Sequence, residues 1–170
     1  KTEESIMSIL GAVIVPHPPL IIPTVGRGRE RDVQATIDAY RTAVEQVAAW
    51  NPESLIITSP HSVMYADYFH IAPGQSASGD MSAFGAAQTR LTVEYDVPLR
   101  DEVIRRGEAA SLQVGTLGEQ DPSLDHGAFL PLYFLREAGV DCPILRVSLS
   151  GFSPLDHYRL GQCIAQAVEA

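Results

Sequence analysis

Two histidines in this sequence have the residue type and setting of metal ligands. His17 stands in Val-Pro-His-Pro-Pro directly after an apolar run, and His61 stands in Ser-Pro-His-Ser directly after a second apolar run. Imidazole is the commonest nitrogen ligand for iron, zinc and copper. The proline beside each histidine confines the backbone at that point. We therefore interpret His17 and His61 as a candidate pair of metal ligands, and the alternative is that each is bonded only to nearby backbone.

A third histidine, His126, follows Asp125 at the predicted start of an apolar helix over residues 128–137. An aspartate in this place caps the helix through its side chain and leaves the next residue free to face a cleft. His126 is thus a candidate catalytic acid, base or substrate-orienting donor, although the residues alone favour the plain role of a helix start. We interpret His70, inside a strand pattern, and His157, near the last helix, as structural.

The remaining pattern predicts a single α/β domain. Five apolar positions at helical spacing (Val33, Ile37, Tyr40, Val44 and Val47) predict an amphipathic helix that ends at Asn51-Pro52. Strand, helix and strand then follow in the order of a βαβ unit, which predicts a mostly parallel or mixed sheet with helices on both faces. We predict strands at residues 6–15, 55–58, 91–95, 112–117 and 144–149, and further helices at 96–109, 128–137 and 156–170. The last helix has Tyr158, Leu160, Ile164 and Val168 as candidate core positions. Residues 74–85 are predicted to form a mobile loop or lid.

This arrangement places the candidate ligands together. In α/β folds, ligands collect just beyond the carboxyl ends of the strands. His17 and His61 each follow a predicted strand at that end, so we expect them to converge in one crevice. Other templates for chemistry fail. Gly26-x-Gly28 has no third glycine at the dinucleotide-binding offset, and no Walker A, nucleophile-elbow or His-Glu-x-x-His motif is present, so we predict no nucleotide-binding residues.

Composition excludes several kinds of partner. The 170 residues carry 21 acidic and 12 basic side chains, a formal net charge of −9, which repels phosphate backbones and anionic membranes. No apolar run approaches the roughly 20 residues that span a bilayer. We therefore expect no nucleic acid and no membrane among the partners. Two cysteines, Cys142 and Cys163, make no disulfide framework, and we interpret them as partly buried thiols of a cytoplasmic protein.

Three segments together are similar to a known family. Residues 11–20 (GAVIVPHPPL), 57–62 (ITSPHS) and 123–127 (SLDHG) resemble motifs of the LigB-type, class III extradiol ring-cleavage dioxygenases. More narrowly, the chain resembles the dioxygenase-like domain of AmmeMemoRadiSam system proteins, which are related to the Memo proteins. The resemblance covers residues 7–170, and we interpret residues 1–6 as upstream or added residues.

The resemblance implies a function and a set of roles. In the catalytic members the histidines that match His17 and His61 bind Fe(II), and the histidine that matches His126 helps to place substrate or oxygen. The reaction is the ring cleavage of a small aromatic diol with O2. The family's third ligand, a glutamate, and its base, a further histidine, have no counterpart in these 170 residues. We therefore expect a LigB-like domain that is incomplete at its C-terminus and binds Fe(II) or another divalent metal weakly or not at all.

Three alternatives stay open on the sequence. The chain is the N-terminal portion of a ring-cleaving dioxygenase domain, inactive alone. It is instead a Memo-like metal- or partner-binding module that keeps the cleft without oxygen chemistry. In the third alternative, a homo-oligomer completes the site from a neighbouring chain, since Glu119, Asp121 and Asp125 have no spacing that requires any of them to act as the third ligand.

Overall fold

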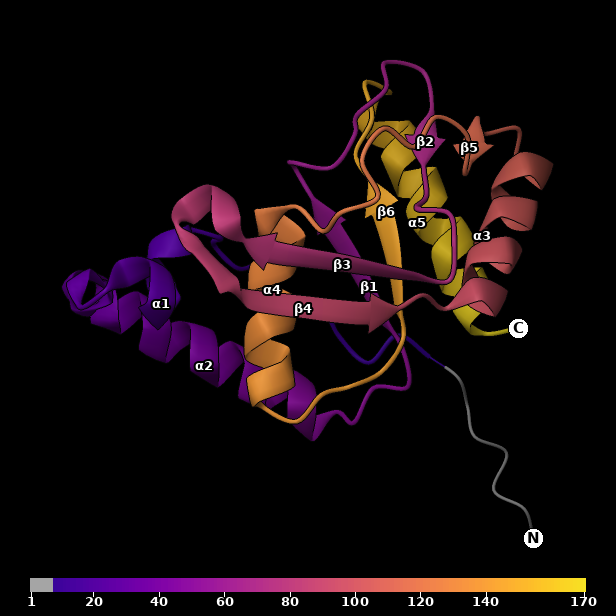
Figure 1. Cartoon of the computed structure of the whole chain (residues 1–170). Coiled ribbons are helices and arrows are strands. Elements are labelled where there is room, and N and C mark those ends of the chain that lie inside the picture. The colour runs from indigo at the N-terminus through magenta and orange to yellow at the C-terminus, as the bar shows by residue number, and fades with distance from the viewer. Residues whose placement is uncertain (1–7) are drawn as a thin grey trace, which may run out of the picture.

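Two parallel strands lie at the centre of the molecule, and His61 follows the end of one of them (Figure 1). The computed structural model describes residues 8–170. Strand β1 (Leu55–Ser59) pairs with β6 (Ile144–Ser148) in parallel, so that Ser59 lies opposite Ser148. All five residues of β6 are buried, as expected for a strand that is covered on both faces.

Four further strands extend this centre. Strands β2 (Phe69–His70) and β5 (Val114–Gly115) form a second parallel pair, and β3 (Ser76–Met81) and β4 (Ala86–Glu94) form an antiparallel hairpin. Single bridges join these pairs to β6, from Ile71 to Val147 and from Tyr95 to Ile144. The strands therefore make a mixed arrangement of parallel and antiparallel pairs around β6.

Helices cover this arrangement on both sides. Helices α3 (Val97–Ala109) and α5 (Pro154–Val168) lie side by side, and Val103 and Leu160 pack with Val147 of β6. On the other side, α2 (Gln34–Ala49) packs against α4 (His126–Glu137), where Tyr40 contacts Phe134 at a ring-centroid distance of 4.7 Å. The predicted α/β class with helices on both faces is thus confirmed. The shorter helical turns are η1 (Pro19–Ile21), α1 (Pro23–Gly26), η2 (Arg29–Val33) and η3 (Ser82–Phe84).

The predicted helix ranges agree closely with the helices of the structure. The spacing of apolar residues located α2, and four of its five predicted core residues are buried; Val33 instead ends η2 and is partly buried. Asp96 caps α3 by accepting a hydrogen bond from the backbone N–H of Leu99 at 3.0 Å. The prediction of Tyr158 as a core residue of α5 is wrong, because its side chain is 65% exposed, whereas Leu160 is buried and Ile164 packs partly against the core.

The prediction of a strand at residues 6–15 is wrong for the residues that the structure describes. Residues 8–15 run without strand pairing, and Ile9, Leu10, Val13 and Ile14 are exposed. A strand needs a neighbour for its backbone groups, and β1 pairs with β6 alone in the described chain. The predicted βαβ unit of 6–15, α2 and β1 is therefore not formed. The prediction for residues 1–6, and residue 7, lie outside the described residues.

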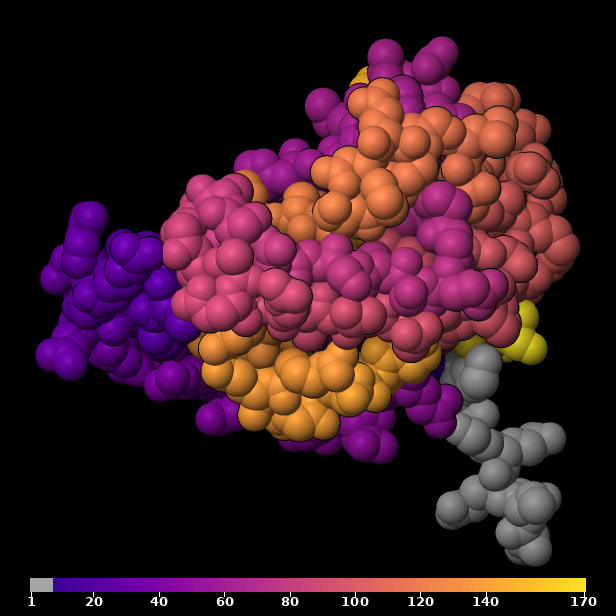
Figure 2. All heavy atoms as spheres, in the orientation of Figure 1, coloured from indigo at the N-terminus to yellow at the C-terminus, as the bar shows by residue number. Residues whose placement is uncertain are grey.

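A mobile loop at residues 74–85 is also contradicted. This stretch forms β3 and η3, and its partner β4 begins at Ala86, earlier than the predicted 91–95. The small residues have a packing role: a Cβ on Gly79 would lie 2.8 Å from the backbone oxygen of Leu124. Gly85 makes the turn with φ of 75°, a conformation that glycine adopts without strain. Figure 2 shows the hairpin in pink across the middle of one face.

Both cysteines are free; Cys142 is half-buried and Cys163 is buried, as predicted. Within residues 8–170, no helix has the length and apolar character needed to cross a bilayer.

Candidate metal centre

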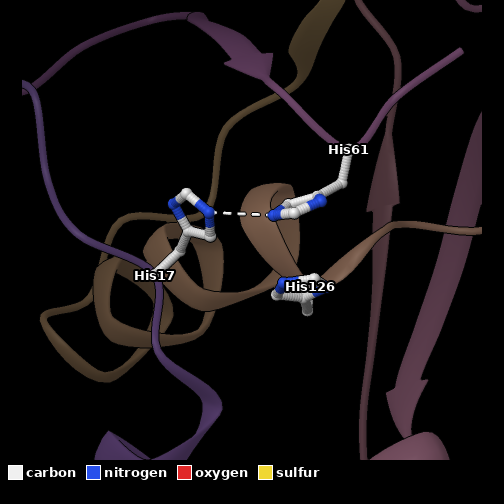
Figure 3. Close-up of side chains that lie close together, drawn as sticks. All are labelled: His17, His61 and His126. Carbon is white, nitrogen blue, oxygen red and sulfur yellow. Dashed lines mark hydrogen bonds between the residues drawn. The ribbon is translucent and has the colours of Figure 1, made fainter.

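The three histidines singled out from the sequence lie together (Figure 3). His17 lies in the extended segment before η1, His61 lies two residues beyond the end of β1, and His126 is the first residue of α4. The Nε2 atoms of His17 and His61 are 3.0 Å apart. One ring nitrogen from each histidine lies within 4.8 Å of the other two. We call these residues the histidine triad.

A single carboxylate joins the segments that carry His61 and His126. Asp125 caps α4 by accepting hydrogen bonds from the backbone N–H groups of Gly127 (2.9 Å) and Ala128 (3.1 Å). The same side chain accepts hydrogen bonds from Ser59 Oγ at 2.5 Å and from Ser62 Oγ at 2.9 Å. The backbone N–H of His61 donates to Ser59 Oγ at 3.1 Å, so the carboxylate holds the end of β1 to the start of α4.

A glycine makes this close approach feasible. A Cβ on Gly127 would lie 2.4 Å from Ser59 Oγ and 3.2 Å from the His61 ring. Any side chain there would therefore push β1 away from α4. Phe84 of η3 covers another side of the triad, with its ring centroid 5.3 Å from that of His126.

The charge states suit a metal site. Burial, together with the neighbouring imidazoles of His61 and His17, holds the pKa of His126 below its usual range. Its ring is therefore neutral at pH 7 and keeps a lone pair for a ligand. Burial raises the pKa of Asp125, but the hydrogen bonds from Ser59, Ser62 and the helix start outweigh it and hold this pKa below its usual range.

The donors of the triad fit a divalent transition metal. Metal–nitrogen distances are about 2.1 Å, and two nitrogens at right angles around one ion then lie about 3 Å apart, which matches the 3.0 Å between His17 and His61. His17 and His126 are half-buried and His61 is exposed, so solvent reaches one side of the cluster. Three protein ligands with an open side are typical of catalytic rather than structural metal sites.

None of the three acidic residues considered above joins the triad in the described chain. Both oxygens of Asp125 are engaged by the serines and the helix start. Glu119 lies 3.3 Å from Arg146, and Asp121 accepts the backbone N–H of Ser123. The cluster of potential ligands found among residues 8–170 is made of histidine alone.

A pocket of about 220 Å³ opens beside His61. Ser62 and Asp121 line it, and Arg146 of β6 reaches it from the sheet. Sequence reasoning did not identify Arg146, because a single arginine in a buried strand has no local pattern that marks it. Nor did it connect Asp125 with Ser59 and Ser62, which flank His61 but meet their partner only in the folded chain.

The other two histidines lie apart from the triad. His70 is buried in β2, and its Nε2 is 3.9 Å from Glu119. His157 accepts a hydrogen bond from the backbone N–H of Ser150 at 3.3 Å, and its ring packs against Phe69. Their positions agree with the structural role predicted for both.

Comparisons with known proteins agree with these features. The family model described as the catalytic LigB subunit of aromatic ring-opening dioxygenase matches residues 11–170. Protein CA_C1420 of Clostridium acetobutylicum is 29% identical over 170 residues, which cover 96% of this chain and 36% of that protein. The chain thus spans about a third of the length of this curated relative. The narrower resemblance to AmmeMemoRadiSam and Memo proteins stays a prediction. Because the family model matches residues 11–170, nearly the whole chain, the chain belongs to the LigB family of aromatic ring-opening dioxygenase subunits.

Proposed function

We propose that this chain provides the metal-binding part of a non-haem Fe(II) extradiol dioxygenase, which opens the ring of a small aromatic diol with O2. The observation that carries the proposal is the meeting of His17, His61 and His126 from three separate segments, with ring nitrogens within 4.8 Å of one another. Membership of the LigB family supports the reaction class. The chain covers only 36% of the curated relative, so the ring-opening activity of a whole protein is part of what we propose.

Each residue of the site has a separate role in this proposal. His17 and His61 would hold the metal through their Nε2 atoms, which lie 3.0 Å apart. His126 would supply the third nitrogen in place of the family's carboxylate. When bound, ferrous iron supplies a place where diol and O2 meet and through which electrons pass between them. The hydrogen bonds of Asp125 with Ser59 and Ser62 fix the positions of His61 and His126 relative to each other. Phe84 packs against the ring of His126.

Equilibrium titration with Fe(II) under argon tests the ligand set. Because His126 adds a third nitrogen that the sequence-based expectation of weak binding did not include, we expect one ion per chain in the wild type and at least about a hundredfold weaker binding in His17→Ala and His61→Ala. His126→Ala should weaken binding by about tenfold or more, because a third ligand is lost. His157→Gln, outside the triad, serves as the control and should leave the affinity unchanged. Unaltered affinity in His17→Ala would refute the site, and unaltered affinity with slower turnover in His126→Ala would return His126 to the role of a substrate-orienting donor.

A second candidate function is a Memo-like metal- or partner-binding module without oxygen chemistry. The specific observation in its favour is that the triad, within the part of the chain that the structure describes, has no carboxylate to balance the charge of a divalent ion. Oxygen uptake by the Fe(II)-loaded chain, with a panel of catechols, separates the two. Uptake together with a ring-opened product supports the enzyme, whereas tight metal binding without uptake supports the module.

A further inference from the structure

The pocket beside His61 adjoins the histidine triad, because His61 belongs to both. Its volume of about 220 Å³ is several times the roughly 30 Å³ share of one water molecule, so it accommodates a short side chain. His61 forms part of its wall, and the remaining wall comes from Ser62, Val63, Gln120, Asp121, Ser123, Asp125 and Arg146. What this pocket binds therefore depends on the charges in its wall.

Its one positive group is already neutralised. Arg146 is 5% exposed, and its Nη2 donates to Glu119 Oε2 at 3.3 Å while its Nη1 donates to the carbonyl of Ser123 at 2.7 Å. Within residues 8–170, no other full positive charge lies beside Glu119: His70 lies 3.9 Å away, but burial holds its pKa below the usual range and keeps it neutral at pH 7. Arg146 is therefore the counter-charge of Glu119, and a second anion would have to compete for it.

The rest of the wall is acidic or neutral. Asp121 is exposed, and it accepts a hydrogen bond from the backbone N–H of Ser123 at 2.9 Å. Asp125 adds a second carboxylate. An anionic group that enters the pocket would lose water and lie near two like charges, whereas an ammonium group gains two attractive ones.

We propose that this pocket is a specificity subsite that receives the side chain of the catechol and selects a cationic or neutral side chain over an anionic one. The selection comes from Asp121, with Glu119 acting as the residue that prevents Arg146 from binding a carboxylate. The inference rests on the proposed function, since the diol must first be held at the triad. It names the substrate class as catechols with a short amine-bearing or uncharged side chain.

Calorimetric titration of the full 170-residue chain, loaded with redox-inactive Zn(II), tests the selection without any turnover. Three probes of similar size differ in charge: 4-(2-aminoethyl)catechol, 4-ethylcatechol and 3,4-dihydroxyphenylacetate. We expect the amine to bind about tenfold or more tightly than the acid at pH 7, with the ethyl compound between them. Binding of 4-ethylcatechol reports on the proposed function alone, and the difference between amine and acid reports on this inference.

Two variants identify the residues responsible. Glu119→Gln frees Arg146 and should strengthen binding of the acid about tenfold, so that the preference shrinks or reverses. Asp121→Asn, at an exposed position that tolerates change, should weaken the amine about threefold and leave 4-ethylcatechol unchanged. Glu108→Gln on α3 is the matched control and should behave as the wild type. The inference is overturned if the acid binds as tightly as the amine, if both variants keep the wild-type ratio, or if 4-ethylcatechol fails to bind, in which case the proposed function fails with it.

Discussion

Replacing Asp125 should damage both the stability of the fold and the metal site, because this carboxylate accepts four hydrogen bonds from two segments, the end of β1 and the start of α4. Loss of a helix N-cap costs about 1 kcal/mol. Each hydrogen bond to a charged group contributes about 1.5–3 kcal/mol, and Asp125→Ala removes those from Ser59 and Ser62. We therefore expect the free energy of unfolding to fall by about 4–7 kcal/mol, a large part of the roughly 5–15 kcal/mol of an ordinary domain.

The variant Asp125→Asn separates the contributions. It keeps one oxygen for the backbone N–H groups of Gly127 and Ala128 but loses the negative charge, so the loss should be about 1–2 kcal/mol. Urea denaturation with linear extrapolation measures both variants. Asp80→Ala is the control, since Asp80 also accepts a backbone N–H, from Ser82, but at an exposed turn, and it should stay close to the wild type.

The metal site provides the second measurement for the same perturbation. Groups that orient metal ligands contribute about 10–100-fold to metal affinity. Fe(II) titration of folded Asp125→Ala should therefore show binding weakened by about that factor. If the free energy of unfolding of Asp125→Ala lies within about 1 kcal/mol of the wild-type value and the variant binds Fe(II) equally well, the carboxylate does not hold β1 to α4, and this prediction is refuted.

Three further changes test other contacts. Ser59→Ala removes the partner of both Asp125 and the His61 backbone N–H and should cost about 1–3 kcal/mol in urea denaturation; a loss near zero would contradict the hydrogen bonds. Gly127→Ala should weaken Fe(II) binding at least about tenfold, because its Cβ would lie 2.4 Å from Ser59 Oγ. Gly161→Ala is the control: with open space around it, it should leave Fe(II) binding unchanged and stabilise α5 by up to about 1 kcal/mol in thermal melts. Equal Fe(II) affinities in the two variants would contradict this packing. His70 has a lowered pKa in the fold, so below about pH 6.5 the unfolded chain binds a proton that the folded chain resists, and stability falls as the pH drops; His70→Gln should flatten this fall in melting temperatures measured from pH 8 to pH 5, and an unchanged slope would count against it.

Local pattern located the helices and the most buried strand from the sequence. The apolar spacing of α2, the Asp125 cap and the β-branched run of β6 each report how one segment meets its immediate neighbours. The three histidines were identified by residue type and by their place at the ends of elements. For these features the relevant interactions lie within a few residues along the chain.

Other features depend on contacts between distant segments, and only the tertiary structure decided them. Residues 8–15 have the composition of a strand but no neighbour to pair with. Residues 76–81 are mostly small and polar residues with little preference for strands, yet they pair with β4. The ring nitrogens of the triad come within 4.8 Å, although His17 and His126 are more than one hundred positions apart in the chain. Asp125 meets Ser59 across 66 positions in the same way. Side-chain types are encoded locally, but the distances that make them a site are set by the packing of α4 against β1.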